Sequence, residues 1–149
     1  MTQVKSIMPR DRSDTEPHVP QLIGKLMFEV RDTFAAEDWD GLRQSHFRLL
    51  SNVPRGGISV TDLAQALRMS KQACGQFVTQ LEATGHLAIR ADAADRRVRL
   101  VVRTPLGNRT LKAVNARIRR IERSWARQVG ADRYATFREV LEELTTGKS

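Results

Sequence analysis

The fold is decided by the stretch "SVTDLAQALRMSKQACGQFVTQLEATGHLAIRADAADRRVRLVVRTPLG", residues 59–107. Its first half predicts two short amphipathic helices, because apolar residues recur at helical spacing on both sides of the turn "RMS". Ser59 and Ser70 stand where N-cap residues are expected, and Gly85 is typical of a helix C-terminus. The pattern predicts a helix-turn-helix. The side chains expected to face inward are Leu63, Ala64, Leu67, Ala73, Cys74, Phe77, Val78 and Leu81.

The hydrophobic pattern changes after Gly85 from a helical period to alternation. "HLAIR" and "RVRLVV" have the composition of strands, and "ADAADR" between them supplies a turn. In the second strand Val98, Leu100 and Val102 share one face, and Val101 shares the other face with arginines. We therefore predict a two-stranded hairpin with arginines crowded near its tip. The segment "TPLG" that follows predicts the N-cap and first turn of another helix.

Helical patterns flank this centre on both sides. The apolar spacing predicts helices over residues 20–36 and 40–53 before it, and over 105–147 after it, with a break at Gly130. The flanking helices carry narrow apolar stripes, which pack either on the same chain or on a second subunit. We favour a bundle between two subunits, because chains this short often bury such stripes by oligomerisation. The predicted dimerisation residues are Leu22, Leu26, Leu111, Val114, Ile118, Ile121, Trp125, Phe137, Leu141 and Leu144.

The charge of the chain indicates a polyanionic partner. Lysine and arginine number 25 against 17 acidic residues, which gives a net charge of +8. The excess lies in two consecutive segments: residues 86–103 carry five arginines and two aspartates, and residues 104–130 carry seven cations and one glutamate. Nucleic acid is the first candidate for a partner and an anionic membrane is the second. Arginines also recur along the helix in the second segment, and we expect them to form a solvated face, with contact to flanking DNA as the alternative. They are Arg117, Arg119, Arg120, Arg123 and Arg127.

Several classes of protein are disfavoured by what the sequence lacks. The single cysteine, Cys74, allows no internal disulfide and no multi-cysteine zinc site, and we expect it to be a small core residue. The three histidines have no metal-ligand spacing, and no catalytic constellation or cofactor motif is present. No apolar run approaches the length of a membrane span, and the N-terminus lacks a signal core. We therefore expect a cytoplasmic, non-enzymatic protein without metal, cofactor or membrane partner.

Three motifs in this order resemble the MarR family of bacterial winged-helix regulators. They are Leu81-Glu82-x-x-Gly85-x-Leu87, then Asp95-Arg96-Arg97, then Thr104-x-x-Gly107. The resemblance implies a mainly α fold of the α+β kind, in which a helix-turn-helix with a two-stranded β wing is joined to a dimerisation bundle of N- and C-terminal helices. Residues 1–18 have few apolar anchors, which predicts a flexible arm there. The resemblance implies a single domain over 19–149. Within that domain the winged helix-turn-helix would span about 40–104, and the dimerisation helices about 20–36 and 105–147.

The resemblance also implies how the chain would contact double-stranded DNA. The second helix of the helix-turn-helix would enter the major groove, and Arg97 would insert into the minor groove, oriented by Asp95 through a bidentate ion pair. The alternative for the hairpin is a solvated, charged tip. Gly75 indicates either a close approach to DNA or mere tolerance of glycine. The predicted DNA-binding residues are Ser70, Lys71, Gln72, Gly75, Gln76, Thr79, Arg90, Asp95, Arg96, Arg97 and Arg99.

The function implied is that of a sequence-specific, homodimeric repressor that binds a palindromic operator and responds to a small aromatic or anionic effector. Family members hold such effectors between the DNA-binding lobe and the dimerisation helices. The predicted pocket residues here are Trp39, Arg43, His46 and Phe47. The alternative function is that of a non-specific architectural or RNA-binding protein, which would use its basic charge alone.

Overall fold

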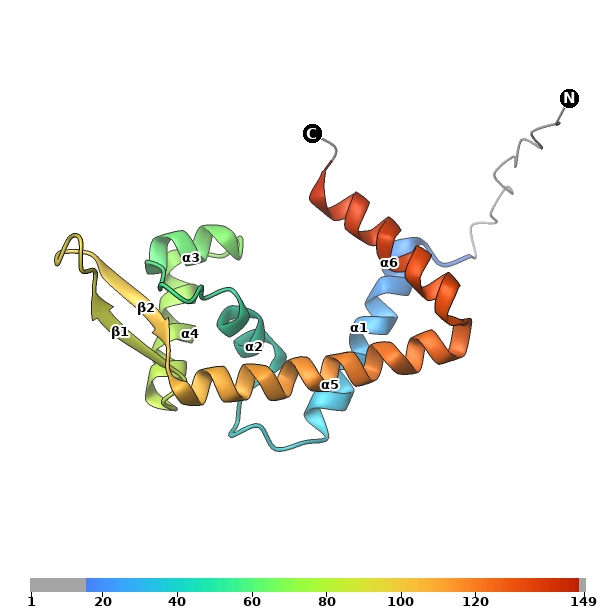
Figure 1. Ribbon diagram of the computed structural model, residues 1–149, viewed down its shortest axis with the longest axis horizontal. Coiled ribbons are helices and arrows are strands. Elements are labelled where there is room, and N and C mark those ends of the chain that lie inside the picture. Colours follow the sequence, from blue (N-terminus) through green and yellow to red (C-terminus); the bar gives the residue numbers. More distant parts are fainter. Residues whose placement is uncertain (1–15, 148–149) are drawn as a thin grey trace, which may run out of the picture.

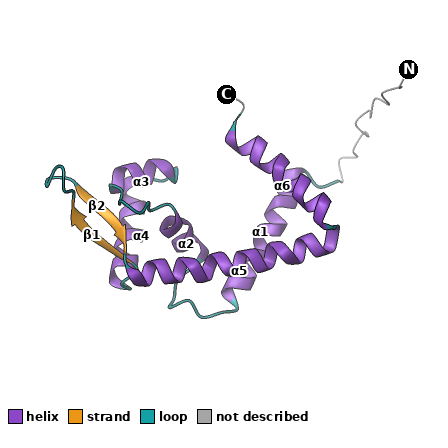
Figure 2. Cartoon of the chain, in the orientation of Figure 1, coloured by secondary structure: helices purple, strands orange, loops and turns teal. Residues whose placement is uncertain are grey.

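The computed structural model describes residues 16–147, so most of the predicted arm over residues 1–18 lies outside the described part. Over those residues the chain is mainly helical with one two-stranded sheet, and the predicted fold class is confirmed (Figures 1 and 2). The elements are α1 (Val19–Ala35), α2 (Gln44–Ser51), α3 (Val60–Ala66), α4 (Lys71–Ala83), β1 (Leu87–Ala91), β2 (Arg99–Arg103), α5 (Pro105–Val129) and α6 (Ala131–Thr146).

Helix α5 runs along the length of the molecule and connects its two ends (Figure 1). One end holds α3, α4 and the sheet, and the other end holds α1 and α6 (Figure 1). The packed residues form two clusters. One is the core of the lobe made by α2, α3, α4 and the sheet, and the other lies where α1, α2 and α5 meet.

Serine caps fix the start of both helices of the helix-turn-helix, as predicted. The Ser59 hydroxyl accepts a hydrogen bond from the backbone N–H of Asp62 at 3.1 Å, and the Ser70 hydroxyl accepts one from Ala73 at 3.1 Å. Between the helices Arg68 adopts a left-handed conformation, with φ of 52°. This conformation ends α3 and turns the chain into α4 within three residues. The turn sequence "RMS" therefore performs its predicted role.

The core of the lobe contains most of the side chains expected to face inward. Leu63, Leu81 and Cys74 are fully buried, and Ala64, Leu67 and Val78 are buried beside them. Ala73 and Phe77 are only half-buried, which corrects the prediction for these two. Phe77 packs instead at the edge of the core, with its ring 5.2 Å from the His46 ring in a T-shaped contact.

The wing is an antiparallel pair in which Leu87 lies opposite Arg103 and Ala91 lies opposite Arg99. A third segment joins the sheet at one residue. Ile58 donates to and accepts from Val101, with N···O distances of 3.0 and 2.8 Å. The face of β2 that is buried is consequently that of Val101, whereas Val98, on the other face, is exposed. Gly57, next to this bridge, has a φ of 88°, a conformation suited to glycine.

The junction between β2 and α5 explains the Thr104-x-x-Gly107 motif. The Thr104 hydroxyl accepts a hydrogen bond from the backbone N–H of Gly107 and donates one to the carbonyl oxygen of Gly85. A Cβ atom at residue 107 would overlap the carbonyl oxygen of His86. Only glycine therefore lets the first turn of α5 approach the backbone of His86, directly before β1, this closely.

The second predicted helix is shorter than residues 40–53. It begins at Gln44, because Asp40 and Gly41 adopt φ of 55° and 76° and cannot continue a right-handed helix. It ends at Ser51, and Asn52 is its C-cap. Residues 40–43 thus belong to the loop that leads from α1 into α2.

The apolar seam of α5 packs largely within its own chain. Val114 and Ile121 are buried against Val30 and Phe34 of α1 and Phe47 of α2. For Val114 and Ile121 this burial favours the alternative, packing within the same chain.

Two polar contacts reinforce the packing of α5. Arg117 forms an ion pair with Glu37 at 2.6 Å, and the Trp125 indole donates to Glu29 at 3.1 Å. Arg117 is consequently not part of a solvated face.

Helices α1 and α6 keep broad apolar surfaces exposed. None of the residues of α6 is buried, and Leu144 on this helix is 75% exposed. Apolar patches of this kind mark interaction surfaces in soluble proteins. The exposed large apolar side chains of these two helices are Val19, Leu22, Ile23, Met27, Phe28, Phe137, Val140 and Leu144.

Candidate nucleic-acid interface

Helix α4 presents a polar surface to solvent along its N-terminal half. Lys71, Gln72 and Gln76 are exposed, so their amine and amide groups are available to a ligand. The two hydroxyl-bearing residues of the predicted set, Ser70 and Thr79, already form hydrogen bonds within the chain. Ser70 caps the helix, and the Thr79 hydroxyl donates to the Gly75 carbonyl oxygen at 2.9 Å.

Gly75 lies in the middle of α4 with no structural reason to be glycine. A Cβ atom placed there would meet no heavy atom within 4 Å, and its φ is not in the left-handed region. Glycine in a helix interior costs about 1 kcal/mol relative to alanine. A contact from outside the chain would give this position a reason to be glycine.

Asp95 organises the tip of the wing through backbone contacts. Its Oδ1 atom accepts a hydrogen bond from the backbone N–H of Arg97 at 3.1 Å. The side chain of Arg97 reaches the same oxygen only through Nε at 3.9 Å, and it is 96% exposed. In this structure the two side chains therefore do not form the expected bidentate pair. The Arg97 guanidinium projects into solvent.

The remaining arginines of the hairpin surround this tip. Arg96 and Arg99 are exposed, and Arg90 on β1 reaches back to the carbonyl oxygen of Gly56 at 3.5 Å. The hairpin thus carries a dense positive charge with two aspartates, one of which, Asp92, also stabilises the turn by accepting from the Ala94 backbone N–H at 3.2 Å. Such a projecting cationic tip suits phosphates or a narrow minor groove.

Cys74 lies on the opposite, buried side of α4 and is 0% exposed. Its burial raises the pKa of the thiol, which disfavours the reactive thiolate. This agrees with the expected role as a small core residue.

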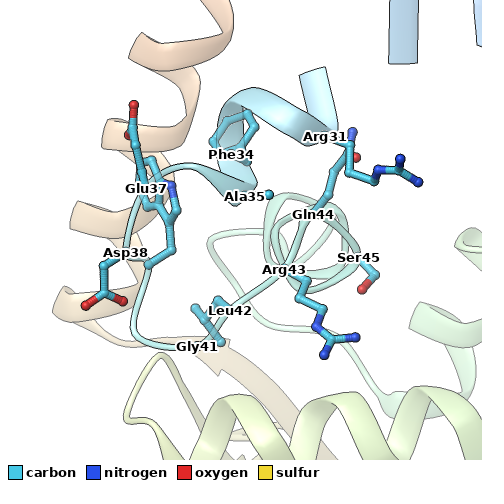
Figure 3. A pocket seen from close by; sticks show the side chains of 11 residues that line it. Arg31, Phe34, Ala35, Glu37, Asp38, Gly41, Leu42, Arg43, Gln44 and Ser45 are labelled. Carbon is cyan, nitrogen blue, oxygen red and sulfur yellow. The ribbon is translucent and has the colours of Figure 1, made fainter. Parts of the chain in front are cut away.

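A cavity of about 580 Å³ lies beside the loop between α1 and α2. Trp39 and Arg43, two of the predicted pocket residues, line it. Figure 3 shows charged side chains on two sides of this cavity, with Glu37 and Asp38 on one side and Arg31 and Arg43 on the other. The cavity therefore offers both signs of charge beside an aromatic wall.

A second cavity, of about 500 Å³, lies between α1, α2 and α5, and Phe47 lines it. Phe34 lines both cavities, and its ring lies 5.4 Å from Trp39 and 5.5 Å from Phe47. Phe34 was not among the predicted pocket residues, although an aromatic residue at the end of the first predicted helix could have indicated it.

His46 lines neither of these two cavities, so its role as a pocket residue stays a prediction. Its Nδ1 atom accepts a hydrogen bond from the backbone N–H of Arg43 at 3.0 Å, and Nε2 lies 2.8 Å from Oε1 of Gln80 on α4. Among the described residues, no cluster of histidine, cysteine and acidic side chains could hold a metal ion. None of the described helices is long and apolar enough to cross a membrane.

The sequence model of the MarR family matches residues 40–98, the segment that holds the helix-turn-helix, β1 and the wing tip. The winged-helix part of the chain is therefore similar to the MarR family, over less than half of the chain. Members of the MarR family are transcription regulators and not enzymes.

Known relatives and solved structures are also similar to this chain. The chain is 36% identical over 76 residues to the transcriptional activatory protein BadR of Rhodopseudomonas palustris, a match that covers 48% of this chain and 43% of BadR. The crystal structure of MarR has a TM-score of 0.77 and 20% identity, covering 91% of this chain and 93% of MarR. CouR from Rhodococcus jostii RHA1, bound to p-coumaroyl-CoA, has a TM-score of 0.68 and 18% identity, covering 87% and 90%. These two structures establish likeness of fold, and the BadR match spans less than half of that relative.

Proposed function

We propose that this chain is a homodimeric, ligand-responsive transcription regulator that binds a palindromic operator. Helix α4 enters the major groove with Lys71, Gln72 and Gln76, and the wing places Arg97 at the adjacent minor groove. The observation that carries the proposal is the combination of an exposed polar α4 with an exposed, arginine-tipped wing in a MarR-family fold. Such a regulator acts in the cytoplasm, where bacterial DNA lies.

The dimer is supported by the apolar surfaces of α1 and α6. Phe28 and Leu144 are 54% and 75% exposed, and a second copy of the chain would cover such side chains on both helices. A two-fold dimer presents two copies of α4, which must lie about 34 Å apart to enter successive major grooves of one duplex. The Phe137→Glu, Leu144→Glu double variant should therefore be monomeric in analytical ultracentrifugation and should lose tight operator binding.

Ligand response is supported by the two cavities that adjoin α1 and α2. The volumes of about 580 and 500 Å³ lie in the range of small-molecule sites. Their aromatic walls and the arginines Arg31 and Arg43 suit a small aromatic or anionic effector, and CouR is a fold relative with an aromatic acyl-CoA bound. An effector that prefers one spacing of the two α4 helices shifts the dimer population and thereby changes operator affinity.

We propose repression as the outcome of binding, although BadR is named as an activatory protein. A bound dimer that overlaps a promoter blocks transcription, whereas one bound upstream can assist it. A reporter placed behind the selected operator in its natural position distinguishes the two. Lower expression with the protein present supports repression, and higher expression refutes it.

The experiment that tests the function is selection of bound fragments from genomic DNA, followed by competition. Specific binding should survive a large excess of random duplex, and the selected fragments should share an inverted repeat. Binding that random duplex or RNA abolishes would instead support the alternative, a non-specific basic protein.

A further inference from the structure

A third cavity, of about 400 Å³, lies at the base of the wing, between the α2–α3 loop, the end of β2 and the first half of α5. Four cationic side chains line it, together with the amides of Asn108 and Asn115. The cations are Arg55, Arg103, Lys112 and Arg119. None of the described residues that line this cavity is acidic.

The four cations are not neutralised by the described part of the chain. None of them forms an ion pair or hydrogen bond with another described residue, whereas Arg117 on the same helix pairs with Glu37. The Nε atom of Arg103 is buried without a partner, which leaves a charged donor unsatisfied. Four like charges around one cavity repel one another, and an anion bound between them would relieve that repulsion.

The register of the wing sets this cavity apart from the wing tip. Arg103 pairs with Leu87 at the base of the hairpin, and four residue steps of about 3.3 Å separate it from Arg99. A concave site of this volume suits a small molecule. The DNA backbone is convex, so the projecting wing tip suits it better than a concave cavity does. Asn108, Lys112 and Asn115 follow one another at helical spacing, so they lie on one face of α5 and together form one wall of the cavity.

We propose that this cavity is a binding site for a small molecule that carries a diphosphate or two phosphate groups. A phosphate monoester carries about −1.5 to −2 charges at neutral pH, so two such groups match four cations. Arginine and amide donors suit phosphate oxygens, which accept several hydrogen bonds each. The site goes beyond the proposed function, because operator binding does not require it. Its occupant would connect the wing to α5, the helix that leads to the other end of the molecule.

The test is calorimetric titration of the full-length protein with inorganic pyrophosphate and, separately, adenosine diphosphate, at about 0.15 M ionic strength. We expect saturable binding of at least one of them. Equal affinities indicate that the diphosphate group alone is recognised, and tighter binding of adenosine diphosphate indicates that an organic diphosphate is preferred. No saturable binding of either probe overturns the proposal.

A pair of matched variants separates a site from general positive charge. Lys112→Gln with Arg119→Gln removes two lining cations and should weaken probe binding at least about tenfold. Arg120→Gln with Arg123→Gln removes the same charge from exposed positions of the same helix and should change affinity by less than about twofold. Equal losses in both pairs overturn the proposal. The proposal is also overturned if the Lys112→Gln, Arg119→Gln variant weakens duplex binding and leaves pyrophosphate binding unchanged. The four cations would then be a DNA contact.

Discussion

His46 on α2 and Gln80 on α4 are joined by a hydrogen bond of 2.8 Å between Nε2 and Oε1. Because Nδ1 of the same ring accepts from the backbone N–H of Arg43, Nε2 carries the hydrogen and donates it to Gln80. One imidazole thus connects the residue that lines the cavity beside α1 to the helix we place in the major groove. A change at the cavity that moves Arg43 would act on α4 through this ring.

The His46–Gln80 contact should stabilise the lobe measurably. His46→Phe keeps a ring of similar size against Phe77 but removes both hydrogen bonds, so the free energy of unfolding should fall by about 1–2 kcal/mol. A double-mutant cycle with Gln80→Met, in urea at fixed protein concentration, should give a coupling energy of about 0.5–1.5 kcal/mol. A coupling energy of zero would mean that the contact contributes nothing to stability.

The exposed guanidinium of Arg97 should contribute to operator binding without affecting assembly. Arg97→Ala removes a 96% exposed cation from the wing tip, and operator affinity should fall by about ten- to a hundredfold. The control is Arg120→Ala, which removes an exposed cation from α5 and should leave affinity nearly unchanged. Fluorescence anisotropy with labelled operator measures both. Equal affinity of Arg97→Ala and wild type would remove the wing from the mechanism.

Gly75 should be a position where helix stability and DNA binding conflict. Gly75→Ala meets no neighbouring atom in the chain, so the protein should become more stable by up to about 1 kcal/mol. If α4 approaches the duplex closely at this residue, the added methyl group lowers operator affinity by about tenfold or more. Thermal unfolding and anisotropy measure the two effects on one sample. A more stable variant with unchanged affinity would show that glycine is merely tolerated here.

His86 should make stability depend on pH below neutrality. Its ring is 1% exposed between Thr84 and Thr110, and burial lowers its pKa, an effect that the Asp40 carboxylate partly opposes. Because the unfolded chain binds a proton more readily, stability is present above the ordinary histidine pKa of about 6.5 and is lost as pH falls below it, by at most about 1.4 kcal/mol per pH unit. In His86→Gln this dependence should be absent. Identical pH profiles of unfolding free energy for the two proteins would contradict the assignment.

Local signals were sufficient to predict the centre of the fold. Ser59, Ser70 and Thr104 each cap a helix through the backbone N–H three residues further on, and Gly85 follows the end of α4 with a positive φ. The change of hydrophobic period after Gly85 likewise follows from strand geometry alone. The family resemblance rested on the same short motifs, which is why it identified the winged helix.

Features that depend on distant contacts were not predictable in the same way. The inward orientation of Val101 results from its bridge to Ile58, which lies in a loop far away in the sequence. His46 has an apolar-face position in the sequence pattern, yet its partner, Gln80, is on another helix. The basic cavity at the wing base assembles Arg55 and Arg103 with α5, and no spacing in the sequence brings them together.

The central claim is that two identical protomers bind one palindrome, and analytical ultracentrifugation of the protein with a selected operator tests it most directly. The account predicts a dimer at micromolar concentration without DNA and a complex of two protomers on one duplex, which is lost when one half-site is scrambled. A single protomer on the duplex, or equal binding to intact and scrambled sequences, would contradict it.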